Sequence, residues 1–400
     1  TSVANDPPAG VDPGSAEALL WGNAYSMFLW GFQVFAIFVM IAPAMGYILH
    51  VRKRPLMRIS EACRVIFGDK LTDGWAGKAL DILFLVSILA GASVTLGLGA
   101  PIITHNLSAL LGMDVTFGMT IIVTIVWVFL FSLSAYLGIE KGIKRLSTWN
   151  MYLAGLFAIF ILIAGPGVFI MNYFSDSVSF LLTKYLNISL NTASVHEGKA
   201  SHMQSNTVFW YAYSATWAML HSVFAAKISR GRTIKEMILT YLLAPTLISW
   251  VATGVLGGLG VHRYLKGELS VLNLVRESER MAAIPEILST LPLGEFSIIV
   301  FIIVALIFLT TTLDSTTYTV AAYTSTRDMS KHEPPKILRI VIAAVITVMA
   351  LILMRIGGLL PLEVISGLMG LPIIIVQFLL IYAAKRMIDV DRAWQHNVRS

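Results

Sequence analysis

One helix-length stretch of the chain, residues 206–224, combines many aromatic rings with a histidine. Its aromatic residues before the histidine are Phe209, Trp210, Tyr211, Tyr213 and Trp217. At 3.6 residues per turn, Trp210, Tyr213 and Trp217 fall on one stripe. His221 lies one turn beyond Trp217. Each aromatic face attracts a cation by about 0.5–2 kcal/mol, so a stack of such rings can bind a quaternary ammonium group without a carboxylate.

Each of these residues also has a structural interpretation. Aromatic rings pack between helices or form belts at the membrane surface, although Tyr213 and Trp217 lie near the middle of the predicted span. An ionisable histidine inside a span usually faces a cavity or a partner. His221 is therefore either a group that exchanges protons or presents a cation, or a neutral histidine that is hydrogen-bonded at a helix interface.

A second polar cluster interrupts an otherwise apolar segment near residue 310. It consists of Thr310, Thr311, Thr312, Asp314, Ser315, Thr316 and Thr317. Hydroxyls beside a carboxylate offer the hard oxygen ligands that a Na⁺ or H⁺ pathway needs. The alternative is that the threonine hydroxyls bond back to the preceding turn of their own helix.

The composition predicts an all-α membrane protein that positions these residues on spanning helices. The 400 residues are 56% hydrophobic and 13% charged, with a mean hydropathy of +0.77, and a soluble domain rarely has this balance. About 20 apolar residues span a bilayer. The predicted helices are residues 18–49, 79–109, 117–139, 148–174, 206–228, 234–262, 296–325, 336–357 and 361–386. They form one transmembrane domain over 18–386, after an external loop at 1–17 and before a cytoplasmic tail at 387–400.

The distribution of basic residues supports this topology and argues against nucleic-acid binding. Of the 29 Lys and Arg residues, 22 fall in alternate loops and in the tail from residue 385. This is the positive-inside pattern, which predicts that the 50–78 loop and the C-terminus are cytoplasmic. The localisation expected is a plasma or inner membrane, crossed many times.

Other sequence signals exclude several classes of protein. The chain has no P-loop, dinucleotide fingerprint, HExxH or nucleophile elbow, so an enzyme is not predicted. Its single cysteine, Cys63, excludes an internal disulfide, and no metal-ligand set surrounds it. An external N-terminus without a targeting segment leads us to expect that earlier spans are missing.

Five sequence pieces resemble the betaine/carnitine/choline transporter family. The most specific is Ile228-Ser-Arg-Gly-Arg-Thr233, which follows the aromatic helix. The supporting pieces are Tyr25-x-x-Phe-x-Trp30-Gly31, Gly97-Leu-Gly99, Lys141-Gly-Ile-Lys144-x-Leu-Ser147, and Asp314-Ser315. The run from Thr312 to Ser315 is closer to the carnitine-exchanger branch.

The resemblance implies a fold and an assembly. Family members have twelve helices, often form trimers, and build a LeuT-type core from two inverted repeats of five helices. The nine predicted helices then correspond to the last nine, so the chain lacks the first three.

The resemblance also implies where the solute binds. An aromatic box on the helix at 206–228 would hold a trimethylammonium group against the 18–49 helix. Trp217 and Trp30 match the family pattern, whereas Asn206 and Ser214 lose an aromatic ring. The substrate-binding residues expected on this basis are Trp217, Tyr213, Trp210, Tyr211, Ser214, His221, Trp30, Tyr25, Phe35 and Phe38. Because this box is more polar than the family's, a smaller or more hydrophilic solute is also compatible with it.

The coupling ion is left open by two conflicting cues. Thr311 and Thr312 occupy the positions of two hydroxyl residues in sodium-coupled members, so the resemblance implies a Na⁺ site there. His221 stands where sodium-independent members carry methionine, and a protonated histidine would replace the cation. Asp314 and Ser315 complete the expected coupling set, and Na⁺ coupling, H⁺ coupling and exchange remain alternatives.

The sequence as a whole predicts a secondary transporter that works by alternating access. Its substrate would be a small quaternary-ammonium or related zwitterionic solute, and no cofactor other than a coupling ion is expected. Arg230 and Arg232 are predicted to make cytoplasmic contacts that influence gating. The alternative is a membrane sensor of the same fold that binds the solute without transporting it. The expected partners are the solute, the lipid bilayer and two further copies of the chain.

Overall fold

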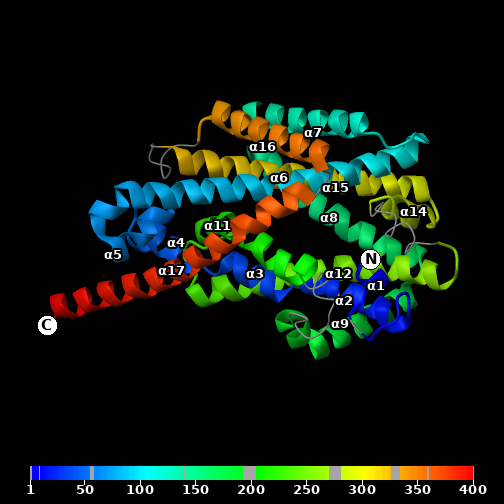
Figure 1. Cartoon of the computed structure of the whole chain (residues 1–400), viewed down its shortest axis with the longest axis horizontal. Helices are drawn as coiled ribbons and strands as arrows, with labels where there is room; N and C mark the ends of the chain where they lie inside the picture. Colours follow the sequence, from blue (N-terminus) through cyan, green and yellow to red (C-terminus); the bar gives the residue numbers. More distant parts are fainter. Residues whose placement is uncertain are drawn as a thin grey trace. The chain divides into compact units, whose positions relative to one another are not determined.

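The computed structural model of the chain consists of helices joined by turns and short loops (Figure 1). It describes residues 2–8, 10–54, 58–137, 140–191, 204–269, 281–325, 334–357 and 360–399. No strand occurs within these ranges. The helices of at least 20 residues are α6 (Trp75–Leu111), α7 (Phe117–Leu137), α8 (Glu140–Ala164), α9 (Gly167–Leu190), α11 (Phe209–Ile228), α12 (Ile234–Leu265), α15 (Gly294–Thr324), α16 (Lys336–Gly357) and α17 (Leu360–Arg399). The shorter elements are α1 (Ser2–Asn5), α2 (Ala16–Leu29), α3 (Phe32–Val39), α4 (Ala42–Gly46), η1 (Tyr47–Val51), α5 (Ile59–Thr72), η2 (Gln204–Val208) and α14 (Ala283–Ser289).

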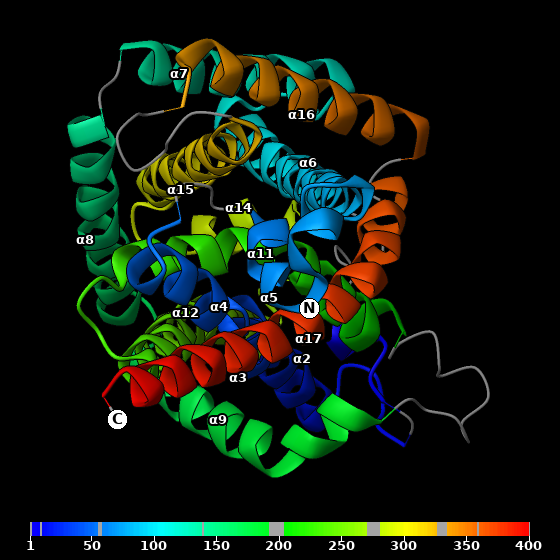
Figure 2. The same ribbon diagram turned by 90° about the vertical axis from the view of Figure 1, so that its left-hand side faces the viewer.

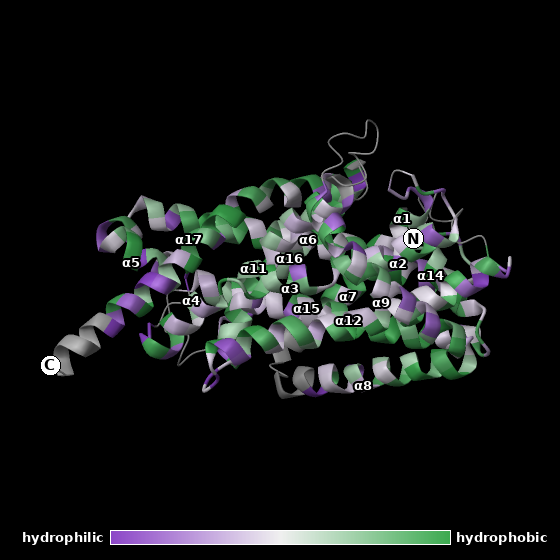
Figure 3. Ribbon diagram, turned by 90° about the horizontal axis from the view of Figure 1, so that it is seen from below, coloured by the Kyte–Doolittle hydropathy of each residue, from purple (hydrophilic) through white to green (hydrophobic). Residues whose placement is uncertain are grey.

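Seven segments of the described chain are long and apolar enough to cross a membrane. They are Ala16–Val51, Trp75–Leu111, Arg145–Ala164, Ile234–Leu265, Gly294–Thr324, Lys336–Ile356 and Glu363–Arg392, and Phe117–Ser132 is a shorter apolar stretch. Figure 3 shows hydrophobic residues along most of α8, whose outer side chains such as Ile163 and Leu156 are exposed. Exposed aliphatic side chains on a helix of this length are typical of contact with lipid. The chain is therefore a multi-pass membrane protein.

The first predicted helix, at 18–49, is divided rather than continuous. It forms α2, α3, α4 and the π-helix η1. α2 ends at Trp30, whose φ of −113° and ψ of 41° leave the helical region. α4 begins with Pro43 in its first turn, and proline has no N–H to bond the carbonyl four residues earlier, so the helix cannot continue from α3. The apolar pattern predicted the span but not these breaks.

The boundaries predicted around residue 148 also need correction. Residues 138–139 lie outside the described residues, but from Glu140 the expected linker is part of α8. α8 ends at Ala164, before the 174 expected, because a turn at Gly165 and Pro166 separates it from α9. In the loop expected at 50–78, the structure has α5, and in the external loop expected at 1–17 it has α1.

The α5 helix is held by charges at both ends. Its Arg64 side chain bonds three carboxylates, those of Glu61, Asp69 and Asp73, across a kink at Gly68 where φ is +70°. The guanidinium group lowers the pKa of Asp73. At the other end, Asp81 of α6 accepts bonds from the Ser60 N–H and hydroxyl.

The single cysteine is inert in this setting. Cys63 lies on α5 and is fully buried. Burial, followed by the nearby charge of Asp81, raises the pKa of its thiol to about 12. Because the thiolate is the reactive form, Cys63 is a packing residue.

The chain divides into two compact units. The first comprises Thr1–Gln33, Leu96–Trp210 and Pro245–Thr312, and the second comprises Val34–Thr95, Tyr211–Ala244 and Leu313–Ser400. In the first unit α2 packs beside α9, as Figure 2 shows, and Tyr173 of α9 donates to the Leu19 carbonyl at 2.6 Å. In the second unit α17 packs against α5 and α4 (Figure 1). There the Arg52 guanidinium donates two hydrogen bonds to the Asp391 carboxylate of α17, from Nη2 at 3.0 Å and from Nε at 3.1 Å.

Candidate functional site

Three aromatic residues contact His221 in the second unit, and a fourth, Phe35, packs behind one of them. The Phe38 ring of α3 lies parallel to the imidazole, with ring centres 4.0 Å apart and planes 3° apart. The Tyr241 hydroxyl of α12 is 2.6 Å from His221 Nδ1. Trp217, one turn earlier on α11, has its ring centre 6.2 Å from the imidazole, and Phe35 meets Phe38 edge-on at 5.9 Å. We call these residues the His221 cluster: Phe35, Phe38, Trp217, His221 and Tyr241.

Backbone packing holds the two main helices of this cluster together. The Ser222 hydroxyl of α11 donates to the Phe38 carbonyl at 2.6 Å, so the end of α3 is fixed beside the middle of α11. Around this contact, small residues bring the backbones close, and Ala42, Ala225 and Val39 are buried with Met237 of α12. The stacked geometry of Phe38 and His221 is therefore supported by packing among α3, α4, α11 and α12.

Two buried polar atoms on the same helix lack a hydrogen bond of normal geometry within the described part of the chain. They are Ser214 Oγ and Trp217 Nε1, on side chains that are 1% and 5% exposed. A buried polar atom without a partner costs about 1–3 kcal/mol, so such atoms often mark a ligand or water position. Both belong to the set that the sequence predicted to bind the solute.

Gly91 of α6 lets the Trp217 indole approach closely. A Cβ built on Gly91 would stand 2.8 Å from Thr216 Oγ1 and 3.0 Å from Trp217 Nε1. On the same face, the Tyr213 hydroxyl lies 3.0 Å from the Thr95 hydroxyl. The glycine-rich stretch of α6 thus shapes the surroundings of two predicted site residues.

The remaining predicted site residues divide between the units. In the first unit, Trp30 and Trp210 meet edge-on at 5.4 Å, and the Trp210 indole donates to the Leu29 carbonyl. Tyr25 is fully buried there, with its hydroxyl bonded to that of Thr207. In the second unit, Tyr211 is partly buried. The structure thus brings Trp30 and Trp210 together in one unit, and brings Phe35, Phe38, Trp217 and His221 together in the other.

The threonine hydroxyls of α15 donate hydrogen bonds to backbone carbonyls of the same helix. Thr311 and Thr312 both donate to the Phe308 carbonyl, at 2.9 and 3.0 Å, and Thr310 donates to the Leu306 carbonyl at 2.7 Å. These are the local bonds that threonine commonly makes in apolar helices. The sodium site expected at Thr311 and Thr312 stays a prediction, because the hydroxyl oxygens keep lone pairs after donating.

Asp314 has a counter-ion that the sequence did not reveal. Arg339 of α16 forms an ion pair and a hydrogen bond with its carboxylate. Arg339 is 4% exposed, and its guanidinium carbon also lies 5.6 Å from the Tyr318 ring centre. A partly buried carboxylate beside an arginine has its charge balanced, so the pair lowers the cost of placing Asp314 within a span.

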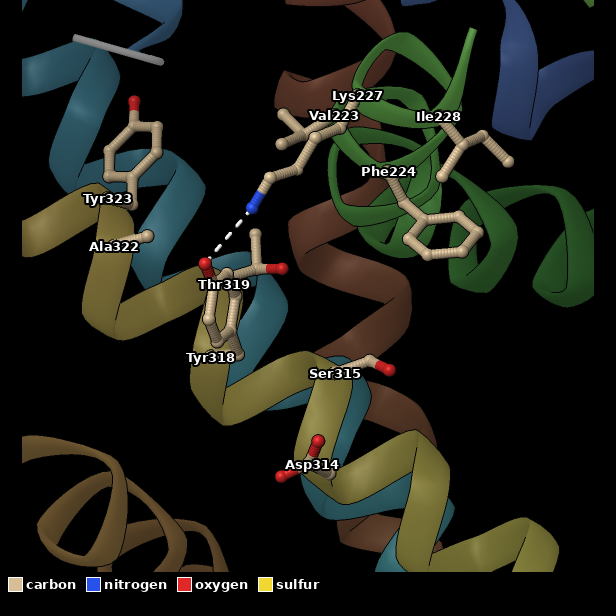
Figure 4. Close-up of a pocket in the computed structure, with 10 residues that line it drawn as sticks. All are labelled: Val223, Phe224, Lys227, Ile228, Asp314, Ser315, Tyr318, Thr319, Ala322 and Tyr323. Atoms are coloured by element: carbon tan, nitrogen blue, oxygen red, sulfur yellow. Dashed lines mark hydrogen bonds between the residues drawn. The ribbon is translucent and has the colours of Figure 1, made fainter. Parts of the chain in front are cut away.

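A cavity of about 190 Å³ opens between the end of α11 and α15 (Figure 4). Asp314 and Ser315 line it together with Lys227, Tyr318 and apolar side chains. The Lys227 ammonium donates to the Tyr318 hydroxyl at 3.0 Å and lies 4.5 Å from the centre of that ring. An ammonium group, a carboxylate and several hydroxyls thus line a mainly apolar cavity.

The specific loop after α11 is a tight helix-to-helix turn. Gly231 has a φ of +80°, which glycine adopts without strain. Thr233 and Glu236 then form a capping box for α12: each side chain bonds the other's backbone N–H, at 3.2 and 2.9 Å. Arg230 and Arg232 are exposed beside this turn. Their gating role remains a prediction.

Sequence reasoning missed Tyr241, Arg339 and Gly91 as members of these clusters. Tyr241 and Arg339 lie among other polar residues on largely apolar helices, so the sequence gave no signal that paired them with His221 and Asp314. Gly91 lies in a run of small residues, which is typical of close helix packing and does not single out one neighbour.

A comparison with known families decides the class of this protein. The model of the betaine/carnitine/choline family transporter matches residues 1–393. The chain belongs to the betaine/carnitine/choline transporter family. It is accordingly a membrane transporter of betaine-, carnitine- or choline-type small molecules rather than an enzyme. Within this family member, the His221 cluster and the unbonded Ser214 and Trp217 atoms are the best candidates for contact with the solute.

Proposed function

We propose that this family member is a secondary active transporter that carries a small quaternary-ammonium or related zwitterionic solute by alternating access. The observation that carries the proposal is the aromatic surface of α11 and α3 beside the buried Ser214 hydroxyl, which lacks a hydrogen bond within the described residues. Trp217 and Phe38 supply faces for the cationic group, and Ser214 supplies a hydroxyl for an oxygen of the solute. Family membership supports the substrate class.

The proposal includes a LeuT-type core of two inverted five-helix repeats, a trimer, and a substrate near that of the carnitine-exchanger branch. The broken first span supports the fold proposal. Transporter sites of this kind often use discontinuous helices, whose interrupted backbone lines a cavity. In this chain one interruption falls at Trp30, which is a predicted site residue. The other falls at Ile41, three residues after the predicted site residue Phe38.

Uptake into proteoliposomes tests the proposal directly. Labelled glycine betaine, carnitine, choline and γ-butyrobetaine are each supplied with and without an inward Na⁺ gradient. Uptake of one compound that depends on the gradient supports Na⁺ symport, and uptake that needs an internal solute supports exchange. Binding of a solute without flux would favour the sensor alternative, and neither binding nor flux for all four would contradict the proposed substrate class.

A further inference from the structure

Tyr241 on α12 has a role that the solute-binding proposal does not use. Its hydroxyl is 2.6 Å from His221 Nδ1, and Phe38 stacks on the imidazole at 4.0 Å. One contact fixes a ring nitrogen and the other fixes the ring plane. His221 is therefore held in a single orientation by two different helices.

The direction of the hydrogen bond follows from the relative acidity of the two groups. The Tyr241 hydroxyl has His221 as its hydrogen-bond partner in the described part of the chain. Either direction uses one of the two polar protons of the pair, so the stronger acid decides which group donates. A phenol is a stronger acid than a neutral imidazole N–H, and the imidazole nitrogen is the stronger base. The favoured arrangement is O–H donating to Nδ1, which leaves the imidazole proton on Nε2.

The second nitrogen is then a donor without a partner among the described residues. His221 as a residue is only partly buried, unlike its buried neighbours Trp217 and Ser222. The groups that face it are Phe38 of α3, Trp217 of α11 and Tyr241 of α12, and of these only the Tyr241 hydroxyl is titratable. A neutral N–H donor among aromatic rings suits an acceptor oxygen on the solute.

We infer that Tyr241 is a positioning residue that holds His221 as the Nε2–H tautomer, so that the imidazole donates a hydrogen bond to an acceptor oxygen of the solute. The inference rests on the proposed function and deepens it. It selects, among quaternary-ammonium compounds, those that carry a carboxylate, because a hydrogen bond to a charged oxygen is stronger than one to a hydroxyl. Glycine betaine, carnitine and γ-butyrobetaine fit this requirement better than choline.

The tautomer can be measured without any transport. Solid-state NMR of membrane-reconstituted protein with ¹⁵N-labelled histidine reports which ring nitrogen carries the proton, and the spectrum of His221→Gln identifies the signals of His221. We expect the wild-type proton on Nε2, and a mixture of tautomers in Tyr241→Phe. A proton on Nδ1 in the wild type, or an unchanged His221 signal in Tyr241→Phe, would overturn the inference even if the protein transports all four solutes.

Transport then tests the consequence for selectivity. Tyr241→Phe should raise KM for the carboxylate solutes by about fivefold, the value of one ordinary hydrogen bond, with a smaller change for choline. Tyr264→Phe is the matched control on the same helix, since its hydroxyl has no hydrogen bond within the described residues. Equal effects on all solutes would show that Tyr241 serves only packing.

The two amide variants of His221 separate its nitrogens. Glutamine places its N–H₂ near the position of Nε2, whereas asparagine places it near Nδ1. We expect His221→Gln to retain more carboxylate-solute uptake than His221→Asn, and the reverse order would contradict the assigned donor. If wild-type protein transports none of the solutes, the proposed function fails, and the NMR result still decides the tautomer.

Discussion

The α11 and α15 helices both carry polar residues in an apolar setting, but the hydrogen-bond partners of these residues lie in different places. On α11, Ser222, His221 and Tyr213 bond to atoms of α3, α12 and α6 respectively. On α15, Thr310, Thr311 and Thr312 donate to carbonyls of their own helix. A polar residue in a span therefore does not by itself mark a site. Polar groups that reach another helix, or that lack a partner, are the better indicators.

Removing the Trp217 indole should cause the largest loss of solute affinity among the variants of α11 and α15. Trp217→Ala deletes a cation-binding face, and we expect solute affinity to fall by about 30-fold or more, since a desolvated cation–π contact contributes about 2 kcal/mol or more. Equilibrium binding of labelled solute to purified protein measures this. Trp149→Ala is the control, because Trp149 on α8 is 71% exposed. Near-normal affinity in Trp217→Ala would remove the aromatic cluster from the site.

The Asp314 and Arg339 pair is the exception on α15, because it joins two helices. Arg339→Ala leaves the Asp314 carboxylate without its counter-ion, and breaking a buried pair costs about 3–5 kcal/mol. We expect a lower thermal midpoint, measured by fluorescence in detergent, and a much smaller drop in the double variant with Asp314→Asn. If Arg339→Ala kept its thermal stability but lost its dependence on Na⁺, Asp314 would be a coupling residue instead.

A change on α6 should act on the solute through Trp217. In Gly91→Ala the new Cβ would meet Thr216 Oγ1 at 2.8 Å and Trp217 Nε1 at 3.0 Å, so the indole must move. We expect about a tenfold loss of affinity, because overpacking at such contacts costs about 1–3 kcal/mol. Gly155→Ala on α8, where a Cβ meets nothing within 4 Å, is the matched control. An unchanged affinity would mean that the position of Trp217 does not matter to the solute.

His221 is expected to influence the ion or pH dependence of uptake. His221→Ala removes the imidazole and its bond to Tyr241, and we expect a changed response to pH or to Na⁺ with a several-fold loss of uptake, the scale of one or two hydrogen bonds. Uptake is measured over a pH series with and without Na⁺. Two unchanged profiles would make His221 a packing residue.

Removing the hydroxyls of Thr311 and Thr312 should give the smallest effect. Thr311→Val and Thr312→Val keep the shape of the side chain and delete its bond to the Phe308 carbonyl, which is worth a few tenths of a kcal/mol at most in an apolar helix. We expect uptake within about twofold of the wild type. Loss of Na⁺ dependence in either variant would instead identify a sodium site, and α15 would then carry functional polar residues as α11 does.

The amino-acid sequence alone determined the class of this protein. Apolar runs that are long enough to span a bilayer, and basic residues in alternate loops, are local properties of the chain, so they predicted a helical membrane protein. The loop from Ile228 to Thr233 combines a left-handed glycine with a capping box, and its residues indicated the family before the family model confirmed it.

Tertiary structure decided which polar residues have partners. The sequence placed Asp314 and His221 inside spans but gave no sign that Arg339 and Tyr241 would reach them, because those residues are 25 and 20 positions away along the chain on other helices. It also placed Trp217 on a stripe without showing that Gly91 makes room for it. Partner choice depends on which helix faces pack together, and the periodicity of one helix carries no information about the face of its neighbour.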